Sequence, residues 1–208
     1  MFEIRQCTHP ECGLRLPIDP ALYRGAYCPR CGAPMIRVGS SYQHRQTLSE
    51  LQPKRRISVL LDNLRSAYNT GAIFRTADGV GAAHLYLGGI TPNPTENMAV
   101  GKTALGSELT IPWSSHPDAC ALAQDLQAEG FRLLVLETTP QAVPIFDVDL
   151  QCFGTDPLLL VVGNEQAGVD PGLLELCDLV LALPMVGSKA SLNVAVAFGV
   201  AAYWLAFS

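Results

Sequence analysis

The sequence predicts an α/β fold with a parallel β-sheet, preceded by a small metal-binding module. Short apolar runs at 158–162 and 179–183 each end at turn-forming residues, as buried parallel strands do. Further apolar runs alternate with stretches of helical periodicity, and this alternation favours parallel strands joined by helices. The module is predicted by two pairs of closely spaced cysteines within residues 1–39.

The cysteine pairs of residues 1–39 are spaced as in a zinc ribbon. Four residues separate the first pair and two separate the second, and a glycine follows each pair. Closely spaced thiolates can hold one tetrahedral ion, which would supply much of the folding energy of so short a segment. We expect structural zinc rather than two disulfides or four free thiols, with His9 as an alternative to the first cysteine. The expected ligands are Cys7, Cys12, Cys28 and Cys31.

The charges divide the chain into a basic head and an acidic body. Residues 1–56 hold nine Lys or Arg and four Asp or Glu, whereas residues 57–208 hold five and fifteen. A basic head favours a polyanionic partner, although the cations could also serve only solubility. Residues 40–56 contain Pro53 and end in three consecutive cations, so we predict a basic linker that either contacts the polyanion or remains solvated.

The body begins with a strand–loop–helix–strand unit. Residues 57–62 are apolar and predict the first strand, and a polar loop follows at 63–69. Apolar residues then recur at helical spacing from about 70 to 80, where two glycines end the helix. Residues 84–87 predict the next strand. Such a unit implies a parallel strand pair.

The middle of the chain is less regular. Residues 90–113 show no clear period. A helix is predicted at 117–129, started by Ser115 and Pro117 and stopped by a glycine. Residues 132–137 predict another strand, and the acidic, proline-interrupted segment after it leads to the last two strands.

Polar residues gather where the last two strands end. Gly163, Asn164 and Glu165 follow the first of these strands, and the segment 184–187 follows the second. Open α/β sheets place ligand sites at the carboxyl ends of their strands. A helix apolar on nearly every side follows at 192–206 and predicts a core or dimer-interface helix, because it is too short to span a membrane.

The residues exclude several classes of enzyme. No G-x-G-x-x-G follows the first strand, and no phosphate-binding G-x-x-x-x-G-K-[ST] or nucleophile-bearing G-x-S-x-G occurs. The N-terminus carries no secretory pattern, so we expect a cytoplasmic protein with reduced cysteines and no membrane segment. The polar residues at the strand ends lack a nucleophile and suit transfer between two bound substrates. They are Asn69, Arg75, Asn164, Glu165, Ser191 and Asn193.

Three blocks of sequence carry a family resemblance. They are NLRSAYNTGAIFRTADGVG at 63–81, LVVGNEQAGV at 160–169 and LPMVGSKASLNVAVA at 183–197. In this order they resemble the signature blocks of the SPOUT superfamily in its SpoU (TrmH-like) branch, and the resemblance covers about residues 57–206. The head resembles RNA-binding extensions that some members carry.

The resemblance implies a function and a topology for the body, residues 57–208. SpoU proteins are S-adenosylmethionine-dependent methyltransferases that act on ribose 2′-hydroxyls in RNA, here tRNA or rRNA. The resemblance also implies a deep C-terminal trefoil knot and a homodimer that packs through the knot region. Loops 163–168 and 184–191 would hold the cofactor.

The resemblance also assigns the site residues. The expected catalytic residues are Arg75, Asn69, Glu165, Ser191 and Asn193. The expected cofactor-binding residues are Gly163, Asn164, Leu183, Met185, Gly187, Ser191 and Leu192. Plainer roles exist for several of these. Arg75 could pair with Asp78, Asn69 or Ser191 could cap a helix, Glu165 could be a loop acid, and the glycines could serve only as turn residues.

Three other functions are alternatives to ribose methylation. The chain could be a catalytically silent RNA-binding protein that keeps the SPOUT fold, although the intact motif residues argue against this. Methylation of a base is disfavoured by the SpoU-type blocks. The zinc head could also dock a protein instead of RNA.

Overall fold

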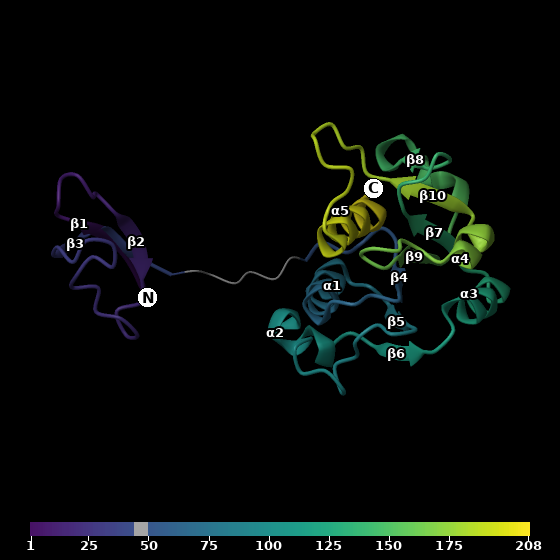
Figure 1. The fold of residues 1–208 in the computed structure, drawn as a ribbon, viewed down its shortest axis with the longest axis horizontal. Helices are drawn as coiled ribbons and strands as arrows, with labels where there is room; N and C mark the ends of the chain where they lie inside the picture. The colour runs from purple at the N-terminus through teal and green to yellow at the C-terminus, as the bar shows by residue number, and fades with distance from the viewer. Residues whose placement is uncertain (44–49) are drawn as a thin grey trace. The chain divides into compact units, whose positions relative to one another are not determined.

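The computed structural model describes residues 1–43 and 50–208 and divides the chain into two units, Met1–Leu51 and Gln52–Ser208. Each unit has its own sheet and its own core, and each is described by itself (Figure 1). The predicted linker at 40–56 overlaps strand β3 at its start, and its residues 44–49 lie outside the described residues.

The first unit is a three-stranded antiparallel sheet in the order β2-β1-β3. Its strands are β1 (Phe2–Cys7), β2 (Arg15–Ile18) and β3 (Met35–Tyr42). The small core consists of Cys7, Cys28 and Met35, with Cys12 partly buried against them. Few apolar side chains are available to stabilise this unit, so the cysteine cluster is its main centre of packing.

The second unit contains a seven-stranded sheet in the order β6-β5-β4-β9-β7-β10-β8. Every neighbouring pair in it is parallel. The strands are β4 (Ile57–Asp62), β5 (His84–Gly88), β6 (Trp113–His116), β7 (Arg132–Leu136), β8 (Val143–Pro144), β9 (Leu158–Val162) and β10 (Leu179–Ala182). The predicted parallel α/β class is therefore confirmed.

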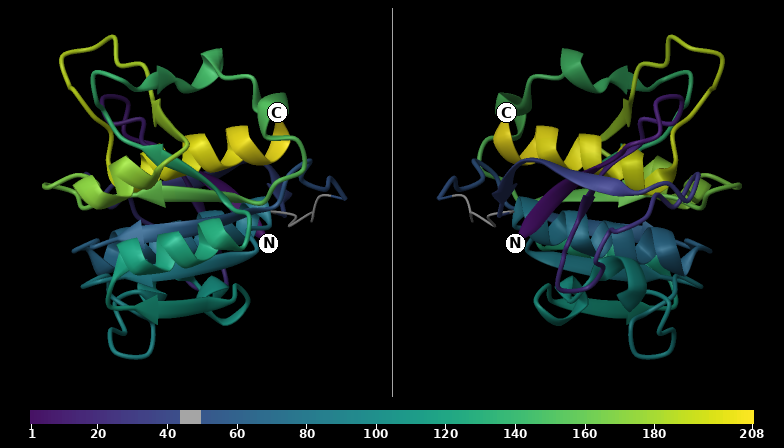
Figure 2. Two further views of the ribbon diagram at one scale, coloured as in Figure 1. Left: turned by 90° about the vertical axis from the view of Figure 1, so that its right-hand side faces the viewer. Right: turned by 90° about the vertical axis from the view of Figure 1, so that its left-hand side faces the viewer.

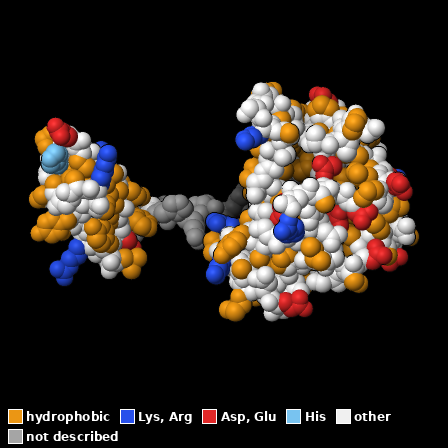
Figure 3. Space-filling view, in the orientation of Figure 1, with side chains coloured by type: hydrophobic (Ala, Val, Ile, Leu, Met, Phe, Trp, Pro, Cys, Tyr) orange, Lys and Arg blue, Asp and Glu red, His pale blue; other side chains and the backbone are white. Residues whose placement is uncertain are grey.

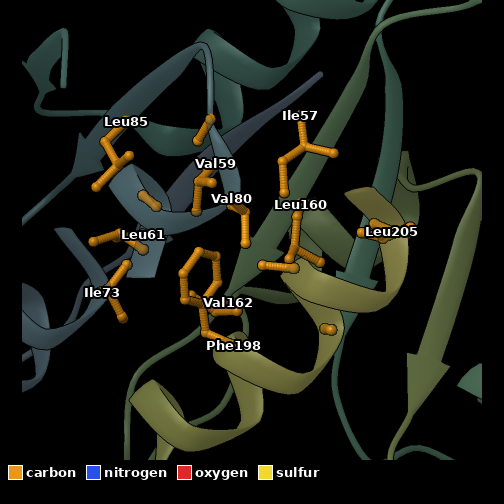
Figure 4. Close-up of a cluster of buried hydrophobic side chains, with 14 of the residues drawn as sticks. Ile57, Val59, Leu61, Ile73, Val80, Leu85, Leu160, Val162, Phe198 and Leu205 are labelled. Atoms are coloured by element: carbon orange, nitrogen blue, oxygen red, sulfur yellow. The ribbon is translucent and has the colours of Figure 1, made fainter. Parts of the chain in front are cut away.

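Helices cover both faces of this sheet (Figures 1 and 2). Helices α1 and α5 pack on one face with Val59 and Leu61, whereas α3 and α4 pack on the other with Leu60. Figure 4 shows Phe198 and Leu205 of α5 pointing toward Leu160 and Val162 of the sheet. The α-helices are α1 (Ala67–Val80), α2 (Gly101–Ala104), α3 (Ala119–Ala128), α4 (Pro171–Leu176) and α5 (Val194–Phe207). Short 3-10 helices are η1 (Ser107–Leu109), η2 (Ile145–Asp147) and η3 (Leu150–Phe153).

Two predicted helix starts were wrong because side-chain caps fix them elsewhere. Helix α1 begins at Ala67, since the Ser66 hydroxyl accepts a hydrogen bond from the Asn69 backbone amide. Helix α3 is capped by the Asp118 carboxylate, and Ser115 belongs instead to strand β6. Strand β6 and helix α4 were not predicted, because the four residues of β6 are mostly polar and the six residues of α4 are too few to show a helical period.

The predicted basic linker is partly an anchored segment. The Arg55 guanidinium donates to the backbone carbonyl oxygens of Gly154 (2.6 Å) and Leu150 (2.9 Å). The backbone amide of Lys54 donates to the Ala206 carbonyl at the end of α5 (2.7 Å). Arg55 is therefore used to hold the start of the second unit and is not a freely solvated cation.

The second unit is rich in acidic residues, and none of its described helices could cross a membrane. Fifteen of the nineteen Asp and Glu residues lie in it, and Figure 3 shows acidic side chains on several parts of its visible face. In the part of the chain that the structure describes, every helix is too short or too polar to cross a membrane.

Candidate active site

A cavity of about 330 Å³ opens at the carboxyl ends of β7, β9 and β10. Its walls come from the loop after β9, the segment after β10 and the first turn of α5. This volume lies within the range of small-molecule sites. Of the predicted cofactor-binding residues, six line the cavity: Gly163, Asn164, Leu183, Met185, Ser191 and Leu192. Gly187 does not line it.

Gly163 allows the loop after β9 to fold back against itself. Asn164 and Gly168 pair as an antiparallel bridge, with two backbone hydrogen bonds of 3.0 Å. A Cβ atom at Gly163 would lie 2.5 Å from the backbone of Gly168 and Val169. No side chain fits at this distance, so glycine is required for the cavity wall to close.

Glu165 joins the loop after β9 to the start of α1. Its carboxylate accepts hydrogen bonds from the backbone amides of Arg65 (2.9 Å) and Ser66 (3.1 Å) and from the Asn69 side chain (2.9 Å). Partial burial opposes ionisation of Glu165, but these donors outweigh it and lower the pKa of the carboxyl. The site therefore holds a fixed negative charge at neutral pH.

Asn193, from the third block of sequence at 183–197, also belongs to this network. Its side-chain amide donates to the Asn69 side-chain oxygen (3.1 Å), while its own oxygen caps α5 at Ala195 (2.9 Å). Asn69, Glu165 and Asn193 are thus brought together from three distant parts of the chain. The cap of α5 is Asn193, so the alternative that Ser191 caps this helix was wrong.

Arg75 stands apart from the network. It lies exposed on α1, and it forms no hydrogen bond or ion pair with any residue that the structure describes. The alternative that it pairs with Asp78 is not observed, because Asp78 accepts from the Thr110 hydroxyl (3.0 Å). The plainer role for Asn69 was also wrong, since Ser66 is the cap of α1.

Sequence reasoning missed Glu137 as a wall of the cavity. Its carboxylate accepts from the backbone amides of Thr138 (2.7 Å) and Val169 (3.1 Å), which ties the end of β7 to the loop after β9. The available signal was a carboxylate directly after an apolar run. Because the predicted strand 132–137 included Glu137, this residue was assigned to the strand and not to the site.

The lowered pKa of Glu165 predicts how stability depends on pH. The folded carboxyl titrates below its ordinary value of 4.5, so its hydrogen bonds stabilise the fold above that pH. This contribution is lost as the pH falls through the lowered pKa. We expect the difference in unfolding free energy between wild type and Glu165→Gln to be constant from pH 8 to 5. It should shrink at lower pH, as urea unfolding at several pH values would measure; a difference that grows on acidification would contradict the assignment.

The four predicted cysteine ligands of the first unit converge on one point. All four Sγ atoms lie within 4.8 Å of one another, with Cys7 to Cys31 at 3.4 Å and Cys12 to Cys28 at 3.7 Å. A tetrahedral zinc–thiolate site with bonds of ~2.3 Å has sulfurs about 3.8 Å apart, so the cluster could hold zinc. His9 is not part of the cluster; its backbone amide donates to Cys7 Sγ (3.4 Å).

The thiols of this cluster differ in their acidity. Burial raises the pKa of Cys7 to about 12, together with the neighbouring thiols. Burial also opposes ionisation of Cys28, but backbone amides of Cys31 and Arg30 and the adjacent sulfurs lower its pKa to about 7.

Most of the second unit is similar to known proteins. Residues 56–203 match the SpoU rRNA Methylase family. The tRNA (guanosine(18)-2′-O)-methyltransferase of Aquifex aeolicus is 32% identical over 166 residues, covering 75% of this chain and 72% of that protein. The 23S rRNA (guanosine-2′-O-)-methyltransferase RlmB of Pseudomonas syringae is 36% identical over 146 residues, but this chain spans only 54% of its length.

Solved structures are similar over the same region. The SpoU methyltransferase AviRb from Streptomyces viridochromogenes, in complex with AdoMet, is 28% identical with a TM-score of 0.64. This match covers 75% of this chain and 61% of AviRb. The family match includes all three sequence blocks and the whole cavity wall, and it leaves out the cysteine cluster. The chain therefore belongs to the SpoU rRNA methylase family.

Proposed function

We propose that this protein transfers a methyl group from S-adenosylmethionine to a ribose 2′-hydroxyl of tRNA or rRNA. The observation that carries the proposal is the network of Asn69, Glu165 and Asn193 at the rim of the 330 Å³ cavity. The names of the relatives from Aquifex and Pseudomonas support the reaction, and they include both tRNA and rRNA substrates.

The cavity suits a cofactor with a positive charge. When bound, S-adenosylmethionine supplies a methyl group on a sulfonium. Glu137 and Glu165 contribute negative charge, and among the described residues no Lys or Arg lines the cavity. Backbone around Gly163, Leu183, Met185 and Leu192 would hold the adenine and methionine portions, with Asn164 and Ser191 completing the wall and Gly187 shaping the loop.

Transfer replaces the sulfur–methyl bond with an oxygen–methyl bond, and the ribose hydroxyl loses its proton. We assign Arg75 to the phosphate beside this ribose, because its guanidinium is exposed and unpaired among the described residues. Arginine stays protonated at neutral pH, so it stabilises the developing alkoxide by charge. Ser191 and Asn193 would orient the ribose. The released proton goes to water or to a phosphate oxygen.

The knot and the dimer are also proposals. The loop at 163–168 and the segment 184–191 meet in one cavity, which is the arrangement a knot would require. Helix α5 leaves Val196 (54%), Val200 (39%) and Tyr203 (50%) exposed at helical spacing. This apolar stripe fits a second copy of the chain, because a two-fold interface pairs like surfaces.

The head, residues 1–39, is proposed to be a zinc ribbon that binds RNA. The distances between the sulfurs fit one tetrahedral ion, and the basic character of this region suits phosphates. Zinc would stabilise the fold of the head and take no part in the chemistry, since four protein ligands leave it no open position.

Removal of the metal should unfold the head and spare the body. We expect Cys28→Ser or a strong chelator to abolish protease resistance within residues 1–43, while the thermal transition of residues 52–208 changes little. Metal content and limited proteolysis of the full chain would measure this. As a control, Cys152→Ser changes an exposed cysteine in the body and should leave both properties unchanged. An intact head in Cys28→Ser would contradict the zinc assignment.

Methyl transfer itself can be tested with labelled S-adenosylmethionine and separate tRNA and rRNA pools that lack the modification. Label in an alkali-resistant dinucleotide would establish ribose methylation and identify the substrate class. Label that leaves alkali-sensitive bonds would indicate a base. Absence of both transfer and cofactor binding would favour a catalytically silent RNA-binding protein.

A further inference from the structure

A second cavity lies on the same edge of the sheet as the candidate active site. It has a volume of about 490 Å³ and is formed by the loop after β5, residues 89–97, and by residues 115–117 at the end of β6. Strand β4 lies between β5 and β9 (Figure 1), so its carboxyl end separates the two cavities. The nearest strands of the two cavities, β5 and β9, are two strand spacings of ~4.8 Å apart, or about 10 Å. The facing rims of the two cavities are therefore within reach of adjoining nucleotides.

The segment after β4, residues 63–65, forms a ridge that contacts both cavities. Asn63 accepts a hydrogen bond from the Asn164 side chain (2.6 Å) on one side and from the Ile90 backbone amide (3.2 Å) on the other. The Leu64 amide donates to the Thr91 hydroxyl (3.0 Å). These bonds fix the ridge to the wall of each cavity, so the two cavities keep one relative position.

Close packing at the second cavity confirms this fixed geometry. Gly89 has φ +58°, and a Cβ atom there would lie 2.0 Å from the Asn63 side-chain oxygen. Asn63 itself has φ 56°, a left-handed conformation that asparagine adopts more readily than other non-glycine residues. The loop at 89–97 is therefore packed directly against the ridge.

Arg65 is the cation on this ridge. Its backbone amide binds Glu165 (2.9 Å), and its guanidinium donates to the Gln166 side chain at the rim of the first cavity. The side chain is exposed and forms no ion pair with any described residue. A guanidinium has five N–H donors, so it retains donors for a phosphate.

The second cavity itself has the chemistry of a base-binding pocket. Asn97, Ser115 and His116 offer hydrogen-bond donors and acceptors, and Ile90 presents an apolar surface that is 67% exposed. Among the described residues no Lys or Arg lines it, and the carboxylate of Glu96 in its wall accepts from Asn93. A largely polar pocket without cations, beside an exposed arginine, suits a nucleoside whose phosphate lies on the ridge.

We propose that the second cavity binds the base of the nucleotide next to the methylated one, and that Arg65 holds the phosphate between them. This rests on the proposed function, because it assumes a ribose at the first cavity. The RNA is then bound as an unpaired, extended strand across the ridge. The site thereby selects loops or single strands, since a base inside a duplex cannot enter the cavity.

Two variants separate the parts of this proposal. Arg65→Gln removes the cation but keeps the backbone bond to Glu165, and Ser115→Tyr fills the second cavity from an exposed position on β6. Gln124 is exposed on α3 and forms no hydrogen bond with any described residue. Gln124→Glu matches the change in charge, and Gln124→Tyr matches the change in bulk.

The probe is a fluorescein-labelled single-stranded RNA dodecamer that contains 4-thiouridine. For Arg65→Gln, we expect roughly a fivefold to tenfold loss of affinity by anisotropy and a salt slope smaller by about 0.7. Irradiation of the wild type should crosslink RNA to residues 89–97 or 115–117, and Ser115→Tyr should lose these crosslinks. All four variants should bind S-adenosylmethionine as the wild type does.

The outcomes distinguish this proposal from the proposed reaction. If the wild type transfers methyl but crosslinks avoid the second cavity, or if the Gln124 variants show equal losses, the assignment of the cavity is wrong. If the crosslinks and their loss occur as expected but no RNA accepts methyl, the cavity binds RNA and the proposed reaction fails instead.

Discussion

Arg75→Lys is expected to lower the rate of methyl transfer by about 100-fold or more while S-adenosylmethionine binding stays within twofold of wild type. Lysine keeps the charge but loses the planar fork that binds a phosphate with two parallel hydrogen bonds. Arg75 lies outside the cavity wall, which is why cofactor affinity should survive. Single-turnover transfer and equilibrium dialysis would measure the two effects separately.

The control for this prediction is Arg132→Lys. Arg132 lies at the opposite end of the strands and pairs with Asp156 (2.9 Å) and Asp178 (3.1 Å), which a lysine can also do. It should retain wild-type activity. Full activity in Arg75→Lys would exclude both the phosphate contact and any role of this arginine in proton transfer.

Glu165→Gln is expected to lower kcat/KM by about 100-fold and also to weaken cofactor binding. The carboxylate serves three donors at 2.9–3.1 Å, from Arg65, Ser66 and Asn69. The glutamine side chain in the variant has one acceptor oxygen, and its NH₂ group would face one of these three donors. An unsatisfied donor costs about 1–3 kcal/mol, and the loop after β9 would also lose its tie to α1.

The matched control is Glu175→Gln on α4, where the carboxylate is exposed and bonds to no described residue. Calorimetry with S-adenosylmethionine and initial rates should find this variant equal to wild type. Wild-type kcat/KM in Glu165→Gln would mean that the network is only a scaffold that tolerates rearrangement.

The sheet was predictable where strands are buried on both faces. Strands β4 and β9 are fully buried and appear in the sequence as continuous apolar runs with clear ends. Strand β6 could not be predicted, because it lies at the edge of the sheet and its polar residues Ser114 and His116 remain partly exposed. The strand order is also hidden from the sequence, because pairing between distant strands leaves no local pattern.

The site was predictable as a set of residues but not as a geometry. Glu165 and Asn193 stand at strand and helix ends, where polar side chains in an apolar context are conspicuous. Their contacts through Asn69 join parts of the chain that no local rule connects. The role of the Arg65 backbone amide could not be predicted, because an amide hydrogen carries no sequence signal.

The position of β9 between β4 and β7 has a consequence for how the chain folds. Contacts across this junction, such as Arg65 with Glu165, join residues 100 positions apart. The sheet cannot form by adding strands in sequence order, because β4 and β7 are joined only through β9, which comes later in the chain. Closure of so long a loop must precede most of the stabilising burial, and domains rich in such contacts fold slowly. Intermediates that lack β9 would expose the unpaired edges of β4 and β7, so this insertion is the step most exposed to aggregation.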